Sequence, residues 1–165
     1  MSFKKAVEMV LHHEGGLVDD KHDRGGLTNY GISQKAYPEV DIKALTKRSA
    51  TDIYKRDYWF KSSCQFLPSS VAIFVFDTAV NMGNSRAAKF LQECSNCTKD
   101  GIIGDNTIRA VHRAYDGSEE VFLHKYKTLR LDHYRKLDTF HRFGRGWTRR
   151  AEEVLEEAKK WIDKS

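Results

Sequence analysis

The sequence predicts a mainly α-helical protein, a helical bundle with a small β-strand or turn element after its first helix. Two observations predict this class. Apolar residues recur at spacings of three and four along most of the 165 residues, as on the buried face of a helix. Between residues 17 and 32 that spacing gives way to glycines and aspartates, which favour turns and short strands.

The first helix is expected over residues 3–14 and has one apolar face. That face carries Phe3, Val7, Val10 and Leu11. Gly15 and Gly16 are expected to end the helix. Residues 17–32 follow as a turn-rich segment with two or three short strands.

Three helices are expected in the middle of the chain. Ser33 can cap a brief one that Pro38 ends, because the residue before a proline disfavours helical geometry. The run Ser49-Ala50-Thr51-Asp52 resembles a capping box that opens a second helix. The apolar run between Pro68 and Gly83 is too long for one strand, so it predicts a buried helix.

Helical spacing continues to the end of the chain. Helices are expected from Ser85, over residues 107–115 and from Ser118. The apolar face of the helix that Ser118 caps is expected to carry Phe122, Tyr126, Leu129, His133 and Leu137. The run Phe143-Gly144-Arg145-Gly146 is expected to separate it from a last helix. That last helix is expected to bury Ala151, Val154, Leu155, Ala158 and Ile162.

Composition excludes several classes of protein. With 40% apolar residues the chain can bury a core and is too apolar to be disordered. No apolar run reaches the ~18 residues of a membrane helix, and Glu8 interrupts any signal-peptide region. Three cysteines, including a lone Cys94-x-x-Cys97, make neither a disulfide framework nor a complete zinc site. We therefore expect synthesis in the cytoplasm without stable membrane insertion.

Positive charge is concentrated in the second half of the chain. The net charge is +5, yet nine Lys and Arg face only two Asp between His124 and Arg150. Such a stretch favours a polyanionic partner, namely nucleic acid, anionic lipid or an acidic cell-wall polymer. The alternative is a solvated helix face.

Glu14 is the first candidate catalytic residue. It continues the apolar stripe of the first helix, three residues after Leu11 and four after Val10. A carboxyl group on a buried face is rare, and one that keeps its proton near neutral pH can act as a general acid. The alternatives are a glutamate paired with Lys or Arg, or one that frays outward at the helix end.

The segment after Glu14 adds candidate partners. It carries Asp19, Asp20 and Asp23 on a glycine-rich loop and then Thr28. A second carboxyl group close to a buried acid is the arrangement for glycoside cleavage. The alternative role of clustered aspartates is to cap turns. Which of the three aspartates is the second carboxylate stays open.

The run from Glu14-Gly15-Gly16 through Asp23-Arg24-Gly25-Gly26 to Ser33 resembles the signature of glycoside hydrolase family 108. These proteins are peptidoglycan N-acetylmuramidases of lysozyme-like fold, found as phage endolysins and bacterial secretion-linked muramidases. Weaker resemblances follow in the family's order, at Tyr58-Trp59, residues 77–83, residues 100–107 and Gly146-Trp147. The last two resemble the family's C-terminal peptidoglycan-binding half.

The resemblance implies an α+β lysozyme-like fold and hydrolysis of the β-1,4 bond between N-acetylmuramic acid and N-acetylglucosamine. Residues 1–90 would form the muramidase lobe and residues 91–165 a helical peptidoglycan-binding lobe, packed as one compact unit. Glu14 would be the general acid, Asp23 the second carboxylate and Thr28 the hydroxyl that holds water or sugar.

The expected substrate-binding residues are Tyr30, Asp77, Asn81, Trp147, Arg149 and Arg150. Asp77 and Asn81 lie four residues apart on the buried helix, where a hydrogen-bonded pair is the alternative. Trp147 beside two arginines can stack on a sugar while they hold a stem-peptide carboxylate. Core packing is the alternative for Trp147.

The implied enzyme needs no metal or cofactor. Its partner is bacterial peptidoglycan rather than nucleic acid, and a monomer is expected. As an endolysin it would need a holin or another export route to act in the periplasm. The alternatives are a basic helical nucleic-acid-binding protein and a non-catalytic wall-binding module.

Overall fold

The computed structural model describes residues 2–19 and 26–162. Within them it confirms a mainly α-helical, lysozyme-like fold with one small antiparallel sheet. The helices are α1 (Ser2–Glu14), α2 (Lys47–Tyr54), α3 (Ser69–Met82), α4 (Asn84–Cys94), α5 (Asp105–Tyr115), α6 (Glu119–Arg135) and α7 (Phe140–Lys159). The strands are β1 (Val18–Asp19), β2 (Leu27–Asn29) and β3 (Ile32–Ser33).

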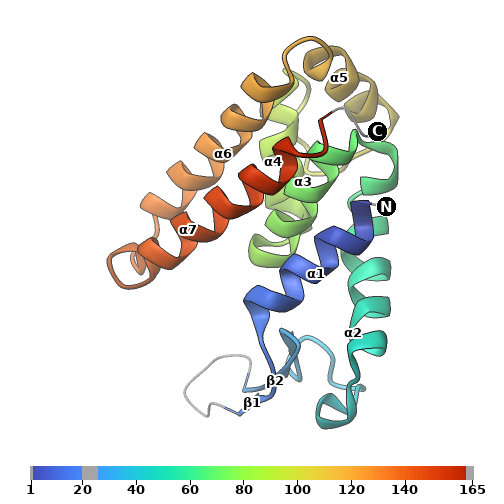
Figure 1. Cartoon of the computed structure of the whole chain (residues 1–165), viewed down its shortest axis with the longest axis vertical. Coiled ribbons are helices and arrows are strands. Elements are labelled where there is room, and N and C mark those ends of the chain that lie inside the picture. Colours follow the sequence, from blue (N-terminus) through green and yellow to red (C-terminus); the bar gives the residue numbers. More distant parts are fainter. Residues whose placement is uncertain (1, 20–25, 163–165) are drawn as a thin grey trace.

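Helix α3 is the centre of the molecule. Every residue from Ser70 to Ala79 is buried, as expected of a helix that is apolar on all sides. Helices α1, α4, α6 and α7 all contact α3, and the sheet lies at the C-terminal end of α1 (Figure 1). The predicted buried helix is confirmed.

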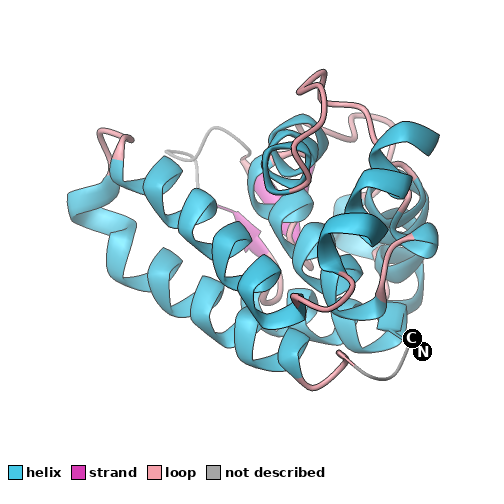
Figure 2. Cartoon of the chain, turned by 90° about the horizontal axis from the view of Figure 1, so that it is seen from above, coloured by secondary structure: helices cyan, strands magenta, loops and turns pink. Residues whose placement is uncertain are grey.

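Helices α6 and α7 form an antiparallel pair along one side of the molecule (Figures 1 and 2). The last turns of α7 also meet the first turns of α1, where Lys5 Nζ lies 4.0 Å from Glu157 Oε1. The last helix therefore packs against the first one. Among the described residues, no helix combines the length and the apolar character needed to cross a membrane.

The sheet follows α1 in the order β1-β2-β3, which confirms the predicted short strands. Val18 pairs with Thr28, and Asn29 pairs with Ile32. Tyr30 and Gly31 form the two-residue turn between β2 and β3 with φ of 53° and 79°. Positive φ at both positions is what a type I′ hairpin turn requires.

Two short elements differ from the prediction. The segment after Ser33 is a single turn rather than a helix, because the Gln34 side-chain amide donates to the Tyr37 and Val40 carbonyls at 2.8 and 2.9 Å. Helix α2 begins earlier than predicted. Its capping box joins Thr46 and Ser49, so Ser49 is the third helical residue and not the cap.

The predicted break at residues 143–146 is also wrong. Helix α7 begins at Phe140 and runs through both glycines without interruption. The ring of Phe140 lies directly on the backbone of Gly144, where a Cβ atom would collide with it. This contact offsets the ~1 kcal/mol that a glycine costs inside a helix.

The buried face of α6 is rotated from the predicted one. It carries Phe122, Tyr126, Arg130 and Tyr134, whereas the predicted Leu137 is 39% exposed. The prediction missed this face because Arg130 is charged and was not counted among the core residues.

Candidate active site

Glu14 is the last residue of α1. The N–H of Gly15 donates to the Leu11 carbonyl at 3.2 Å, and its φ of +76° turns the chain out of the helix. The Glu14 side chain is 25% exposed. It is therefore neither sealed in the core nor frayed into solvent.

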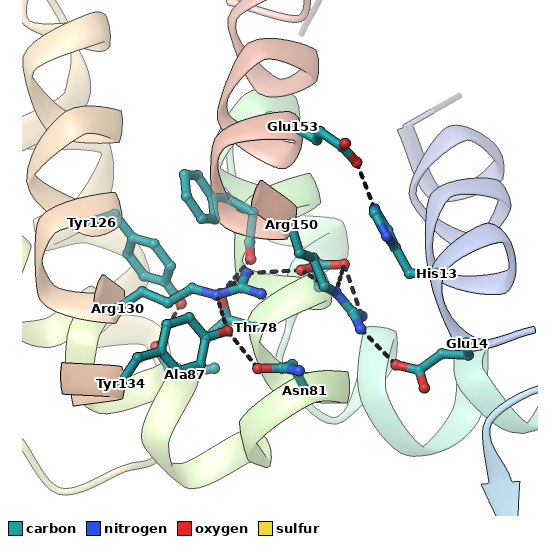
Figure 3. A network of polar contacts seen from close by, with 12 residues as sticks. His13, Glu14, Thr78, Asn81, Ala87, Tyr126, Arg130, Tyr134, Arg150 and Glu153 are labelled. Carbon is teal, nitrogen blue, oxygen red and sulfur yellow. Dashed lines mark hydrogen bonds and ion pairs between the residues drawn. The ribbon is translucent and has the colours of Figure 1, made fainter. Parts of the chain in front are cut away.

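One oxygen of Glu14 is held by an arginine from the other end of the chain. Arg150 Nη1 on α7 donates to Glu14 Oε1 at 2.7 Å (Figure 3). Among the described residues, nothing forms a hydrogen bond with the second oxygen of Glu14. Of the alternatives considered for Glu14, the structure thus shows the one in which it pairs with an arginine.

Asp77 on α3 holds the same arginine. Arg150 Nη2 lies 3.1 Å from Asp77 Oδ1, and Arg130 Nη1 on α6 lies 2.8 Å from Asp77 Oδ2. Asp77 is only 2% exposed. Burial alone would raise the pKa of Asp77, but the positive charges of the two arginines and their hydrogen bonds outweigh it and hold that pKa below its ordinary value.

Arg130 extends the contacts deeper into the protein. Its side chain is fully buried, and it donates from Nε to Tyr134 Oη at 2.9 Å and from Nη1 to Thr78 Oγ1 at 3.0 Å. Tyr134 in turn donates to Asn81 Oδ1 at 2.6 Å. Within the described residues, Arg130 Nη2 has no hydrogen-bond partner.

We call Glu14, Arg150, Asp77 and Arg130 the buried ion network. It joins α1, α7, α3 and α6, and its two carboxylates balance its two guanidinium groups. Losing one partner from a buried pair typically costs about 3–5 kcal/mol, because the other charge stays buried and uncompensated. The network therefore fixes Glu14 relative to three helices that are distant in sequence.

His13 adds a second link between α1 and α7. Its Nε2 lies 3.3 Å from Glu153 Oε2 (Figure 3). Partial burial, and then the positive charge of Arg150, lower the pKa of His13. A lowered pKa disfavours the charged imidazole, so this contact is a full ion pair only at acidic pH.

The β2–β3 turn covers the other side of Glu14. A Cβ atom on Gly31 would lie 2.6 Å from both Glu14 Cβ and Tyr54 Oη, so only glycine fits. Tyr54 Oη donates to the Tyr30 carbonyl at 2.6 Å. Burial, followed by the negative charge of Glu14, raises the pKa of Tyr54. Tyr30 thus contributes its backbone to this packing, while its ring packs against the core.

Thr28 and Asp19 lie on the two strands before this turn. Thr28 Oγ1 donates weakly to the Val18 carbonyl at 3.5 Å, between β2 and β1. Asp19 is exposed at the end of β1. Asp20 and Asp23 fall outside the described residues, so the assignment of Asp23 as second carboxylate stays a prediction.

The remaining predicted substrate-binding residues lie at two different sites on the protein. The ring of Trp147 stacks on Tyr134 with 5.0 Å between centroids, beside a hollow of about 190 Å³ that Asn81 also lines. Arg149 is exposed on a different face of α7. Arg150, expected together with Arg149 to hold a stem-peptide carboxylate, is instead buried and paired with the protein's own Glu14 and Asp77.

The described residues contain no group of three His, Cys, Asp or Glu side chains placed to hold a metal ion. Cys64 and Cys94 are buried free thiols. Burial raises the pKa of Cys94 to about 12, so it stays protonated.

Sequence reasoning missed both Arg130 and the true partners of Arg150. The signal was present, because each arginine continues an apolar stripe, as Glu14 does. Arg150 lies four residues before Val154, and Arg130 four after Tyr126. Two cations and two acids on inward faces of four helices predict mutual pairing.

Family models and a solved structure place the chain among known proteins. A family model described as Glycosyl hydrolase 108 matches residues 7–83, and one described as Predicted Peptidoglycan domain matches residues 86–152. The solved structure of Brucella abortus SagA is 36% identical in sequence and superposes with a TM-score of 0.87, covering 98% of this chain and 95% of that one. No curated protein sequence matches.

These matches and the lysozyme-like fold define a class: the protein is a glycoside hydrolase that acts on peptidoglycan. Its second half is of the peptidoglycan-binding type, which gives the basic stretch a polyanionic partner. Within this class, the chain belongs to the glycosyl hydrolase 108 family. The resemblance drawn from Glu14 to Ser33 is confirmed.

Proposed function

We propose that the protein is an N-acetylmuramidase, a lysozyme that cleaves the β-1,4 bond between N-acetylmuramic acid and N-acetylglucosamine. Glu14 is the general acid, Asp23 the second carboxylate, and Thr28 the hydroxyl that positions water or sugar. The observation that carries the proposal is the setting of Glu14, partly exposed at a helix end, with one oxygen held by Arg150 and the other unengaged among the described residues.

The geometry supports a proton transfer from Glu14. A protonated Glu14 gives its proton to the glycosidic oxygen from the oxygen that Arg150 does not hold. The carboxylate formed in that step then has the Arg150 guanidinium 2.7 Å away, which stabilises its charge. Asp23 stabilises the sugar cation or activates the water that attacks it.

The other predicted site residues form two groups, one buried and one exposed to solvent. Asp77 and Arg150 act as positioning residues, since they are buried and reach Glu14 through hydrogen bonds. Tyr30, Asn81, Trp147 and Arg149 are partly or fully exposed and serve the glycan strand. We also propose a muramidase lobe over residues 1–90 and a peptidoglycan-binding lobe over residues 91–165.

The test is digestion of purified sacculi, followed by mass spectrometry of the new reducing ends. A muramidase leaves reducing N-acetylmuramic acid, whereas reducing N-acetylglucosamine would refute the proposed bond.

Glu14→Gln should lower the rate by about 10²-fold or more, as removal of a general acid does. Glu8→Gln on the exposed side of the same helix is the matched control and should keep full activity. Equal rates in the two variants would refute the role of Glu14.

We further propose that the enzyme works as a monomeric, bacteriolytic phage endolysin. An endolysin made in the host cytoplasm reaches the wall only through a holin or another route. Expression with a holin should lyse the host, and expression alone should not. Lysis without the holin would contradict this route.

A further inference from the structure

A groove between α4 and α6 is separate from the buried ion network. It is an open hollow of about 550 Å³ whose wall includes Phe90 of α4 and His133 of α6. Their rings meet edge to face with 5.8 Å between centroids. Tyr126 closes the base of this interface, because its hydroxyl donates to the Ala87 carbonyl at 3.1 Å. The groove is thus built mainly by two packed helices, with Lys99 from the segment after α4 at its edge.

The rim of the groove is positively charged. Arg86, Lys89 and Lys136 line it, and no carboxylate of the described residues lies within 4.0 Å of any of their charged groups. His133 lines the same hollow, and its pKa is lowered by burial and then by the positive charges of Arg86 and Lys136. We call Arg86, Lys89, Lys136 and His133 the basic groove.

The acidic side chains of the groove do not neutralise these three cations. Glu93 pairs with Lys99 at 3.2 Å, and Asp132 pairs with Arg135 at 3.1 Å. Three positive charges therefore converge on one hollow without a partner among the described residues. Like charges around one hollow repel one another, and an anion in the groove would relieve that repulsion.

The groove leads towards the candidate active site. His133 also lines the neighbouring hollow that holds Asn81 and Trp147. Asn81 accepts a hydrogen bond from Tyr134, one turn of α3 beyond Asp77. A polymer bound at Glu14 and laid over Trp147 would reach the groove next.

We propose that the basic groove binds the carboxylates of the peptidoglycan stem peptide beside the strand that is cut. This inference rests on the proposed function, because it takes peptidoglycan as the substrate. The groove cations all fall within residues 86–152, the segment of the peptidoglycan-binding type. Stem peptides supply several carboxylates on a short chain, which matches three cations around a hollow of this size.

The test compares two sets of charge reversals. The groove variant carries Arg86→Glu, Lys89→Glu and Lys136→Glu. Calorimetry with free stem tetrapeptide should show about tenfold weaker binding, which is ~1.4 kcal/mol and within reach of three exposed ion pairs. A tetrapeptide with amidated carboxylates should bind both the wild type and the variant weakly.

The matched control carries Lys4→Glu, Lys43→Glu and Arg113→Glu, the same change of net charge at exposed sites on other faces. It should bind tetrapeptide like the wild type. An equal loss in the control would overturn the proposal, since net charge alone would then account for binding. Thermal melts of both variants should match the wild type, which establishes that each is folded.

Two substrates separate this proposal from the proposed function. Glycan strands stripped of peptides keep only the lactyl carboxylate, and the groove variant should cleave them at the wild-type rate while cleaving intact sacculi more slowly. Equal slowing on both substrates would overturn the groove as a peptide site. Tighter binding of a DNA duplex than of tetrapeptide, lost in the same variant, would assign the groove to nucleic acid and also overturn the proposal.

Discussion

The buried ion network and the basic groove use the same residue types in opposite surroundings. Arg130 and Arg150 are buried and pair with carboxylates from other helices, whereas Arg86 and Lys136 are exposed and lack such partners among the described residues. In the network, charge sets the position of Glu14 within the fold. In the groove, charge is left available to a ligand. A count of basic residues along the chain cannot distinguish these two roles.

The largest effect should come from breaking the network at its most buried member. Arg130→Met should lower the free energy of unfolding by about 3–5 kcal/mol, because Asp77 then loses one of its two cations in the core. Urea denaturation followed by circular dichroism measures this. Arg135→Met, on the exposed side of the same helix, is the control and should cost no more than about 1 kcal/mol. If both variants lost the same free energy of unfolding, burial would not explain the contribution of Arg130 to stability.

A second, smaller effect should appear as a dependence on pH. The pKa of Asp77 is lower in the folded protein than its ordinary value of 3.8. A lowered folded pKa means that the stabilisation is complete above the unfolded value and is lost as pH falls through the folded pKa. Wild-type stability should therefore fall as the pH drops below about 4, because Asp77 then takes up a proton and its stabilisation by the two arginines is lost.

Asp77→Asn removes that titration, and its stability should fall less steeply with acid than the wild type does. Melting temperatures from pH 7 to pH 2 check this. Asp132→Asn, which removes an exposed ion pair of α6, should follow the wild-type curve. A wild type and an Asp77→Asn variant with parallel curves would contradict the assignment of acid sensitivity to the network.

The smallest effect on stability should come from the basic groove. Each reversal there should change the free energy of unfolding by no more than about 0.5 kcal/mol, as exposed substitutions usually do. Peptidoglycan binding by the wild type should also weaken as salt rises, since exposed charges are screened beyond about 8 Å at physiological ionic strength. Sedimentation with sacculi between low and high salt measures this. A loss of stability as large as that of Arg130→Met would show that the groove charges are structural.

Much of the fold followed from apolar spacing alone. Helices α1, α3, α4 and α5 lie close to their predicted positions, because burial of apolar faces determined them. The sheet was predicted instead from the glycines and aspartates that interrupt the helical spacing. The failures have local causes. Gly144 lies inside α7 because a ring covers it, and the buried face of α6 was misplaced because it contains Arg130.

The candidate site was predictable only in part. Glu14 stood out as an acid on an apolar stripe, and its sequence context led to the family. Helical spacing places Arg150 on an inward face, but it does not show that one of its partners is Glu14, 136 positions away. The requirement for glycine at position 31 was likewise not predictable from the sequence. It arises because Tyr54 and Glu14 approach the Gly31 backbone too closely for a Cβ atom.

The ion pair between Glu14 and Arg150 has a consequence for recombination among relatives. Glu14 lies in the segment matched by the hydrolase family and Arg150 in the segment matched by the peptidoglycan-binding family. A chimaera that takes its first half from one parent and its second half from another inherits the acid and its cation from different lineages. Such exchanges should succeed only where both parents carry the cation at this point of the last helix. The ion pair thus couples the two halves of this chain, although two family models describe them.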